Sequence, residues 1–469
     1  MAHDLFCLFD NGTLRSATHP GSWSDPLSKY LPAVILSGAA VVGVDVQAQA
    51  AGFLQDSTAN LELRNFYINR DNRSGTANPS KQAEWGQGFI LDYRSGYTEG
   101  PIGFGVDALG MLGGHLDSGK GTHYNPTSSS RGGQVFPTDS DGRAVNEFSS
   151  LGPTFKARIS KSELRLGTLR PTLPVVTYND GRMLPQTYEG AQFTTRDIDK
   201  LTLTAGKLTH AKGRNSTDNQ GLSILGANNA TTGQFVNSFL FAGGDYAISK
   251  DLTAQYYYGK LEDFYSQHFL GLIHRAQLPL GSLKTDLRAF ISDSTGKNAS
   301  QAGRAEGYVS NGYHNDGEVD NRAWSAVFTY SLSGHSLGLG YQRLTGSSDF
   351  PFMTMGDGVR AYLTTDRSLN TFQHAGERTL IGTYSYDFAA AGVPGLKLSA
   401  DYLKWQHIQT ATGDSHEWYR GTSLEYMVQS GTFKGLNFAW RNGSFRTALA
   451  SSRDVDESKV IVSYTLALL

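Results

Sequence analysis

Residues 396–402, Leu-Lys-Leu-Ser-Ala-Asp-Tyr, alternate between apolar and polar side chains and follow a Gly- and Pro-containing turn at residues 391–395. Alternation with a period of two is typical of a strand with one apolar face. The same pattern recurs at residues 201–204, 324–330 and 460–466, and no convincing amphipathic helix interrupts it. The sequence therefore predicts an all-β protein.

The connections between these strands form a tight class and a long class, which alternate along the chain. Gly, Pro, Asp and Ser close hairpins, and such turns are centred at residues 99–101, 160–162, 197–199, 249–251, 281–282, 334–335, 391–395 and 429–435. Longer polar stretches lie between them, for example residues 114–149, 211–234, 294–320 and 347–376. Eight tight turns, with both termini on their side, predict an 18-stranded antiparallel transmembrane β-barrel.

Composition agrees with a barrel and argues against several other classes. The 469 residues contain 41 Lys and Arg against 43 Asp and Glu, a balance that gives no basic surface for nucleic acid. No apolar run reaches the roughly 18 residues of a membrane-spanning helix. A soluble solenoid or propeller is the alternative, but we find no repeat of about 40–50 residues, the period of a propeller blade.

The first 50 residues are interpreted as a signal peptide. Lys29 precedes an apolar stretch from Leu31 to Val44, which is followed by Ala48-Gln49-Ala50, a small-x-small cleavage pattern. Residues 1–27, with the only cysteine, Cys7, are interpreted as an over-extended start. A buried hydrophobic helix is the alternative for the apolar stretch. We expect residues 51–469 to form one β-barrel domain without disulfides.

If the apolar face of each strand contacts lipid, the opposite face lines the lumen. By this alternation between outward and inward positions, hereafter parity, the inward acids are Glu62, Asp92, Asp107, Glu163, Asp286, Asp387, Asp401 and Glu425. The inward cations are Arg64, Arg94, Lys156, Arg158, Arg165, Arg275, Arg288, Lys397 and Arg441. A charged interior predicts a water-filled channel. The alternative is that each cation only pairs with an acid on a neighbouring strand and stiffens the wall.

The outward faces also contain aromatic residues that suit the two membrane interfaces. They are Phe89, Tyr93, Tyr97, Tyr256, Tyr258, Trp324, Tyr330, Tyr384, Tyr386, Phe388, Phe438 and Trp440.

The connection between the fifth and sixth strands, residues 171–188, has an unusual composition for a loop in solvent. It contains three prolines together with Leu173, Val175, Val176, Met183 and Leu184. We expect it to fold into the lumen and to narrow the pore with Tyr178, Asp180, Arg182 and Tyr188. A structured cap over the barrel rim is the alternative.

Enzyme motifs are not supported by their context. Residues 103–108, Gly-Phe-Gly-Val-Asp-Ala, fit a dinucleotide pattern but lie inside an alternating strand with no following helix. His416-Glu417 lacks the second histidine of a zinc motif, because Arg420 occupies that position. We therefore expect no enzymatic activity, no catalytic residue, no metal and no cofactor.

Long motifs spread over residues 52–469 resemble the OprD-type, substrate-selective outer-membrane porin family. Among them are residues 63–71 (LRNFYINRD), 84–113 (EWGQGFILDYRSGYTEGPIGFGVDALGMLG), 167–175 (GTLRPTLPV), 179–190 (NDGRMLPQTYEG) and 454–466 (DVDESKVIVSYTL). The resemblance implies an 18-stranded barrel, an inward-folded third loop as the constriction, and basic residues along one wall. It assigns the loop motif to Pro171, Pro174, Tyr178, Asp180 and Arg182, and the arginine of a WRN motif to Arg441. Residues 1–27 and the C-terminal Leu469, where many such barrels end in an aromatic residue, depart from it.

The sequence thus predicts a passive outer-membrane channel of a Gram-negative bacterium for small carboxylate-bearing solutes such as amino acids, peptides or aromatic acids. The expected partners are anionic or zwitterionic solutes, outer-membrane lipid and lipopolysaccharide, with no nucleic acid and a monomeric or weakly trimeric state. A barrel hydrolase and an adhesin that uses the long loops are the alternative functions.

Overall fold

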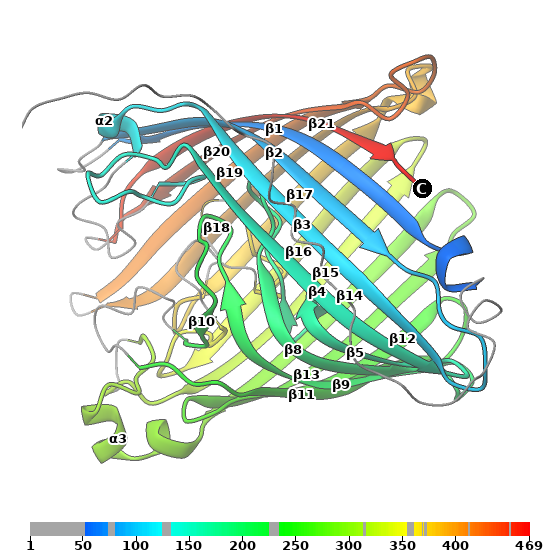
Figure 1. The fold of residues 1–469 in the computed structure, drawn as a ribbon. Coiled ribbons are helices and arrows are strands. Elements are labelled where there is room, and N and C mark those ends of the chain that lie inside the picture. Colours follow the sequence, from blue (N-terminus) through cyan, green and yellow to red (C-terminus); the bar gives the residue numbers. More distant parts are fainter. Residues whose placement is uncertain are drawn as a thin grey trace, which may run out of the picture. The chain divides into compact units, whose positions relative to one another are not determined.

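The computed structural model describes most of the chain after residue 51 (Figure 1). The described residues are 52–73, 80–123, 133–224, 234–312, 316–353, 361–367, 369, 373–410, 413–449 and 452–469. The predicted signal peptide over residues 1–50 lies outside them.

Within these residues, eighteen long strands build the molecule. They are β1 (Thr58–Asn72), β2 (Lys81–Arg94), β3 (Gly103–Asp117), β4 (Glu147–Ile159), β5 (Ser162–Leu169), β8 (Thr187–Thr195), β9 (Leu201–Lys212), β11 (Phe239–Ala247), β12 (Leu252–Leu261), β13 (Tyr265–Gln277), β14 (Ser282–Ser294), β15 (Asp320–Leu332), β16 (His335–Gly346), β17 (Arg378–Asp387), β18 (Leu396–Thr410), β19 (Gly413–Met427), β20 (Asn437–Thr447) and β21 (Val455–Ala467).

Shorter elements occupy the connections. They are β6 (Thr172–Leu173), β7 (Val176–Thr177), β10 (Gln220–Gly221), the α-helices α2 (Lys120–His123) and α3 (Gln301–Ala305), and the 3-10 helices η1 (Gly296–Ala299) and η2 (Phe388–Ala391).

Antiparallel pairing between neighbours runs around the whole sheet and closes it. The first strand pairs with the last over a register from Asn60↔Ala467 to Asn72↔Val455, so no long strand is left with a free edge. The predicted 18-stranded barrel is confirmed. All eight predicted tight turns connect consecutive strands on the rim where both terminal strands have their free ends.

The opposite rim is less uniform than the sequence predicted. The second loop is shorter than expected, because β3 continues to Asp117 and β4 begins at Glu147. β12 and β13 are joined by only three residues, 262–264, on this rim. The strict alternation of tight and long connections therefore fails at this point.

Side chains on the outer face are apolar and exposed. Leu151 is 75% exposed, and Leu339 and Leu380 are each 61% exposed. Such a surface is unfavourable in water and fits the acyl chains of a bilayer.

Among the described residues, no helix is both long and apolar enough to span a membrane.

Candidate functional site: the constriction loop and the lumen wall

The loop between β5 and β8, residues 170–186 and hereafter the constriction loop, is anchored on the inner wall through Met183 and Leu184. Both side chains are almost completely buried. Glycines on β2 and β3 make the space for them: a Cβ at Gly88 would lie 3.0 Å from the carbonyl oxygen of Met183, and one at Gly113 would lie 2.6 Å from its methyl carbon. The glycines of the quoted 84–113 motif therefore form a recess for the loop.

The described residues of the second loop, 118–123 and 133–146, contribute further packing to this anchor. Phe136 is fully buried and packs with Met183 and Phe148 in one apolar cluster. His115 and Phe148 contact the ring of Phe136 edge-on, with centroids 5.1 and 6.1 Å apart. Two loops and the wall thus hold one end of the constriction loop.

The tip of the constriction loop is the β6–β7 hairpin, which packs inside the barrel. Val175 and Val176 are buried in a cluster with Phe239 and Tyr257 of the wall. A Cβ at Gly259 of β12 would lie 3.0 Å from the Cβ of Val175, so a glycine again makes room for the loop. The predicted inward fold is confirmed, and the apolar side chains in the loop are explained by this burial.

Polar contacts fix the segment between these two anchors. Arg64 of β1 donates to Asp180 from Nη1 at 2.6 Å and from Nη2 at 3.3 Å, while its Nε donates to Glu62 at 2.8 Å. Arg64 also donates to the carbonyl oxygen of Arg182 at 3.0 Å. Arg214 donates to Asn179 at 3.0 Å. A guanidinium held by two carboxylates is strongly oriented, so Arg64 and Asp180 form a fixed charged pair at the constriction.

The structure separates the predicted pathway residues into two groups. Asp180 is exposed and Tyr178 is half-buried. Pro171, Pro174 and Arg182 are buried and build the loop. Tyr188 is the second residue of β8 and is buried in the apolar cluster with Val175 and Val176, so the hairpin covers it and it is not open to the pore. Arg182 donates to Gln134 of the second loop at 2.6 Å.

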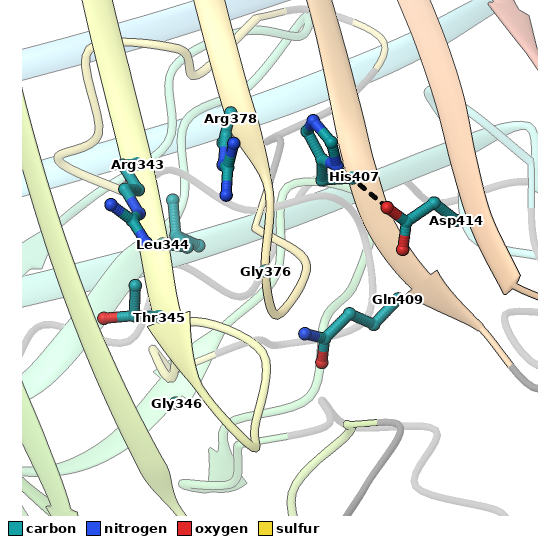
Figure 2. Close-up of a pocket in the computed structure, with 9 residues that line it drawn as sticks. All are labelled: Arg343, Leu344, Thr345, Gly346, Gly376, Arg378, His407, Gln409 and Asp414. Atoms are coloured by element: carbon teal, nitrogen blue, oxygen red, sulfur yellow. Dashed lines mark hydrogen bonds and ion pairs between the residues drawn. The ribbon is translucent and has the colours of Figure 1, made fainter.

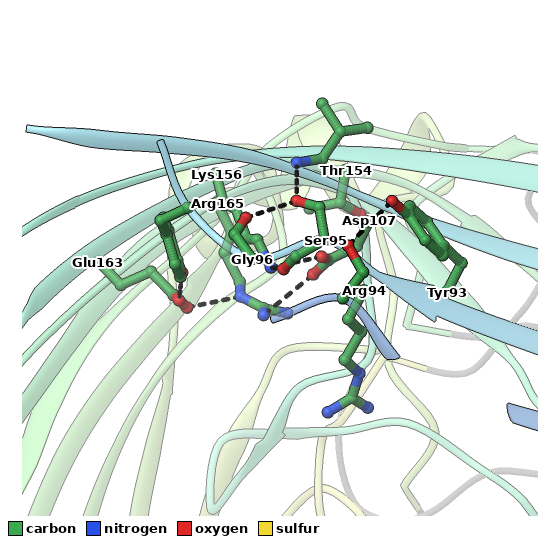
Figure 3. Close-up of polar contacts among 12 residues, drawn as sticks. Tyr93, Arg94, Ser95, Gly96, Asp107, Thr154, Lys156, Glu163 and Arg165 are labelled. Carbon is green, nitrogen blue, oxygen red and sulfur yellow. Dashed lines mark hydrogen bonds and ion pairs between the residues drawn. The ribbon is translucent and has the colours of Figure 1, made fainter. Parts of the chain in front are cut away.

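An ion-pair network lies near the tight-turn rim of β2 to β5 (Figure 3). Asp107 forms an ion pair with Lys156 at 2.6 Å and accepts a hydrogen bond from Arg165 at 3.1 Å, and Arg165 also donates to Glu163 at 2.6 Å. The Lys156 side chain is only 4% exposed. Lys156 therefore stiffens the wall, as the alternative interpretation of the inward cations proposed.

Tyr97 belongs to this network. The prediction that it lies in the outer aromatic girdle is wrong. Its hydroxyl donates to Glu163, and Arg158 lies 4.1 Å from its ring centroid. The reason is that β2 ends at Arg94. The irregular residues that follow no longer obey the alternation of a strand.

The other inward cations differ in whether they have an acidic partner. Arg94 bonds Asp92 at 3.0 Å, Arg288 bonds Asp286 at 2.9 Å, and Arg441 bonds Glu425 at 2.8 Å. Arg158, Arg275 and Lys397 are exposed and form no ion pair with any described residue. In contrast, each predicted inward acid except Asp387 has a cationic partner. Among the predicted inward charges, three cations but only one acid, Asp387, therefore lack an oppositely charged partner in the part of the chain that the structure describes.

Sequence reasoning missed four further cations, two on strands and two in loops. Lys459 forms an ion pair with Glu457 at 2.7 Å, and Arg70 donates to Gln134. Both residues occupy inward positions of their strands, so the alternation of side chains could have identified them. Arg170 bonds Asp92 at 2.6 Å, and Arg367 bonds Asp401 at 3.2 Å. These last two lie in loops, where the alternation gives no signal.

The loop between β16 and β17, residues 347–377 and hereafter the seventh loop, has an acid–base anchor outside the strands. His374 bonds Asp349 at 3.2 Å, and its backbone N–H donates to Glu377 at 3.1 Å. Burial raises the pKa of Glu377 to about 7. Burial lowers the pKa of His374, but the bond to Asp349 and the charge of Asp349 outweigh it and raise that pKa to about 9.

We expect the stability of the protein to fall as the pH rises from about 5 to about 9. Both groups have raised pKa values in the folded state, so the stability that Glu377 contributes is complete below its ordinary pKa of about 4.5 and is lost by about pH 7, and the stability that His374 contributes is complete below about 6.5 and is lost by about pH 9. Thermal unfolding in detergent across this range measures the effect. The Glu377→Gln variant should lose the part of the fall between about pH 5 and about pH 7, and an unchanged profile in that variant would contradict the assignment.

A closed eighteen-stranded barrel, with an apolar outer face and a loop folded into a charged lumen, defines an outer-membrane porin. A family model described as "outer membrane porin, OprD family" matches residues 51–468. The chain belongs to this family, and its place is the outer membrane of a Gram-negative bacterium.

Named relatives and solved structures agree with this assignment. The chain is 36% identical over 432 residues to the "Porin-like protein GalP" of Pseudomonas putida, covering 92% of this chain and 97% of that protein. It is 33% identical over 450 residues to "Porin D" of Pseudomonas aeruginosa, covering 91% and 94%. The crystal structure of Pseudomonas aeruginosa OccK8 (OprE) superposes with a TM-score of 0.82 at 56% identity, covering 89% of this chain and all of that chain.

Proposed function

We propose that this porin is a passive channel for small carboxylate-bearing solutes, such as amino acids, peptides or aromatic acids. The observation that supports this selectivity is the unequal pairing of charge on the lumen wall. Seven of the eight predicted inward acids are held by cations, whereas Arg158, Arg275 and Lys397 are left without a described acidic partner. Such groups attract an anionic solute as it passes but do not bind it tightly, because the attraction between exposed charges in water is weak.

The fixed pair Arg64–Asp180 supports the same proposal at the constriction. Its guanidinium is already held by carboxylates, and Asp180 remains exposed. A zwitterion therefore meets an acid for its amino group at the constriction and unpaired cations for its carboxylate on the wall. We propose a monomer or a weak trimer as the assembly, with outer-membrane lipid and lipopolysaccharide as its surroundings.

Neither alternative function is favoured by the relatives, which are porins. We propose that the chain has no enzymatic activity. Turnover of an ester or a peptide that disappears on substitution of one Ser or His would contradict this proposal.

Liposome swelling with isosmotic glutamate, glutamine and lysine tests the proposed charge preference. The three solutes have similar size and differ in net charge, so the unpaired cations should give the order glutamate, glutamine, lysine in rate, with glutamate at least about threefold faster than lysine. Equal rates or the reverse order would reject selectivity for carboxylates. Dipeptides and aromatic acids in the same assay then define the solute class.

A further inference from the structure

The outer face of β16 and β17 changes from apolar to cationic close to the long-loop rim. On β16 the outward positions Leu337 and Leu339 are more than half exposed, and the outward series continues through Tyr341 to Arg343. On β17 the outward Leu380, also more than half exposed, is preceded by Arg378, the first residue of the strand. Because long loops mark the extracellular rim of such barrels, both arginines lie at the level where acyl chains of the outer leaflet give way to headgroups.

Arg343 and Arg378 are directly opposite each other in the register of β16 and β17. Neither guanidinium group forms an ion pair or a hydrogen bond with any residue that the structure describes. Like charges placed directly opposite on neighbouring strands destabilise a sheet. An anion between the two guanidinium groups removes this repulsion.

The two arginines line a pocket of 230 Å³ together with side chains from β18 and β19 (Figure 2). The register of β18 shifts between Trp405 and Ile408, and His407 within the shift has a φ of +62°. This bulge brings His407 and Gln409 to the pocket. The one acid among the lining residues is Asp414, and its carboxylate bonds the Nδ1 of His407 at 2.8 Å. The two guanidinium groups are therefore the charged groups of the pocket that have no described partner.

Cations continue from this pocket along the same outer face. Lys404 of β18 is outward and exposed, and no ion pair joins it to a described residue. Arg420 of β19 donates only to the hydroxyl of Ser444 at 3.3 Å. The pocket is therefore part of a basic band that borders the apolar belt.

We propose that this pocket binds a phosphate group of a phosphorylated glycolipid in the outer leaflet of the membrane. Arginine matches the geometry of phosphate oxygens with two parallel hydrogen bonds, and each such charge-assisted bond is stronger than a neutral one. The adjoining apolar wall accepts the acyl chains of the same molecule. A soluble phosphate fits the charge of the pocket equally well but gains nothing from Leu339 and Leu380.

Native mass spectrometry of the detergent-purified porin with added lipid A tests the proposal. The Arg343→Gln/Arg378→Gln variant should bind bisphosphorylated lipid A at least about tenfold more weakly than the wild type, since it loses two charge-assisted contacts. Arg322→Gln is the matched control. Arg322 is also an outward cation at the same rim, but Asp293 already neutralises it at 2.6 Å. Its variant should bind as the wild type does.

Two further measurements separate the possible outcomes. Dephosphorylated lipid A should bind the wild type and the double variant equally, and inorganic phosphate should bind far more weakly than lipid A. If the double variant binds lipid A as tightly as the wild type does, the two arginines do not form the binding site. If inorganic phosphate binds tightly and lipid A does not, the ligand is not a lipid. Because both arginines lie outside the lumen, single-channel conductance should be unchanged in the double variant, which verifies that it is folded. The test does not depend on which solute the channel transports.

Discussion

Deleting residues 172–177, the β6–β7 hairpin, is expected to raise the single-channel conductance severalfold. The deletion joins two residues that are already adjacent, since the N–H of Tyr178 donates to the carbonyl oxygen of Pro171 at 2.9 Å. It removes Val175 and Val176 from the lumen and leaves the anchor at Met183 and Leu184 in place. Burying a valine is worth about 1.5 kcal/mol or more, so a modest loss of stability should accompany the wider pore. Conductance in planar bilayers measures the effect.

The matched control shortens a turn outside the lumen. Residues 430–434 lie in the tight turn between β19 and β20, where the N–H of Gly435 donates to the carbonyl oxygen of Val428 at 2.9 Å. Deleting them also joins chain ends that are close together, and the conductance should remain at the wild-type value. If the hairpin deletion also leaves the conductance unchanged, the hairpin does not restrict the pore.

Much of this architecture was predictable because a barrel repeats one local rule. The alternation at residues 396–402 and the tight turns were sufficient to predict the strand number and the closure of the barrel. The inward fold of the constriction loop followed from its apolar residues, which need a surface to cover them. Both inferences depend on local composition, which the sequence displays directly.

The function of individual charges was not predictable, because pairing depends on contacts between distant strands and loops. Lys156 and Arg158 are two residues apart on β4 and share one face, yet the first is buried against Asp107 and the second is exposed over Tyr97. Tyr97 follows the end of its strand, so parity misplaced it. Arg367 reaches Asp401 from the seventh loop, where no periodic pattern exists.

This difference between paired and unpaired cations leads to the second large effect. In the Arg158→Gln/Arg275→Gln/Lys397→Gln variant, the permeability ratio of chloride to potassium should fall at least about threefold, because the lumen loses its unneutralised positive charge. The reversal potential under a KCl gradient measures the ratio. The unfolding midpoint should change little, since these side chains are exposed and surface charges contribute little to stability.

Lys156→Gln is the matched control and should show the opposite behaviour. Its ammonium group lies 2.6 Å from Asp107 and is shielded from the solute path. Removing one partner of a buried pair costs about 3 kcal/mol, and Arg165, 3.1 Å from the same carboxylate, offsets part of that cost. We therefore expect a lower unfolding midpoint with a nearly unchanged permeability ratio. If the triple variant and Lys156→Gln shift the permeability ratio equally, the exposure and pairing of individual cations do not determine the selectivity. The total charge of the lumen would then determine it.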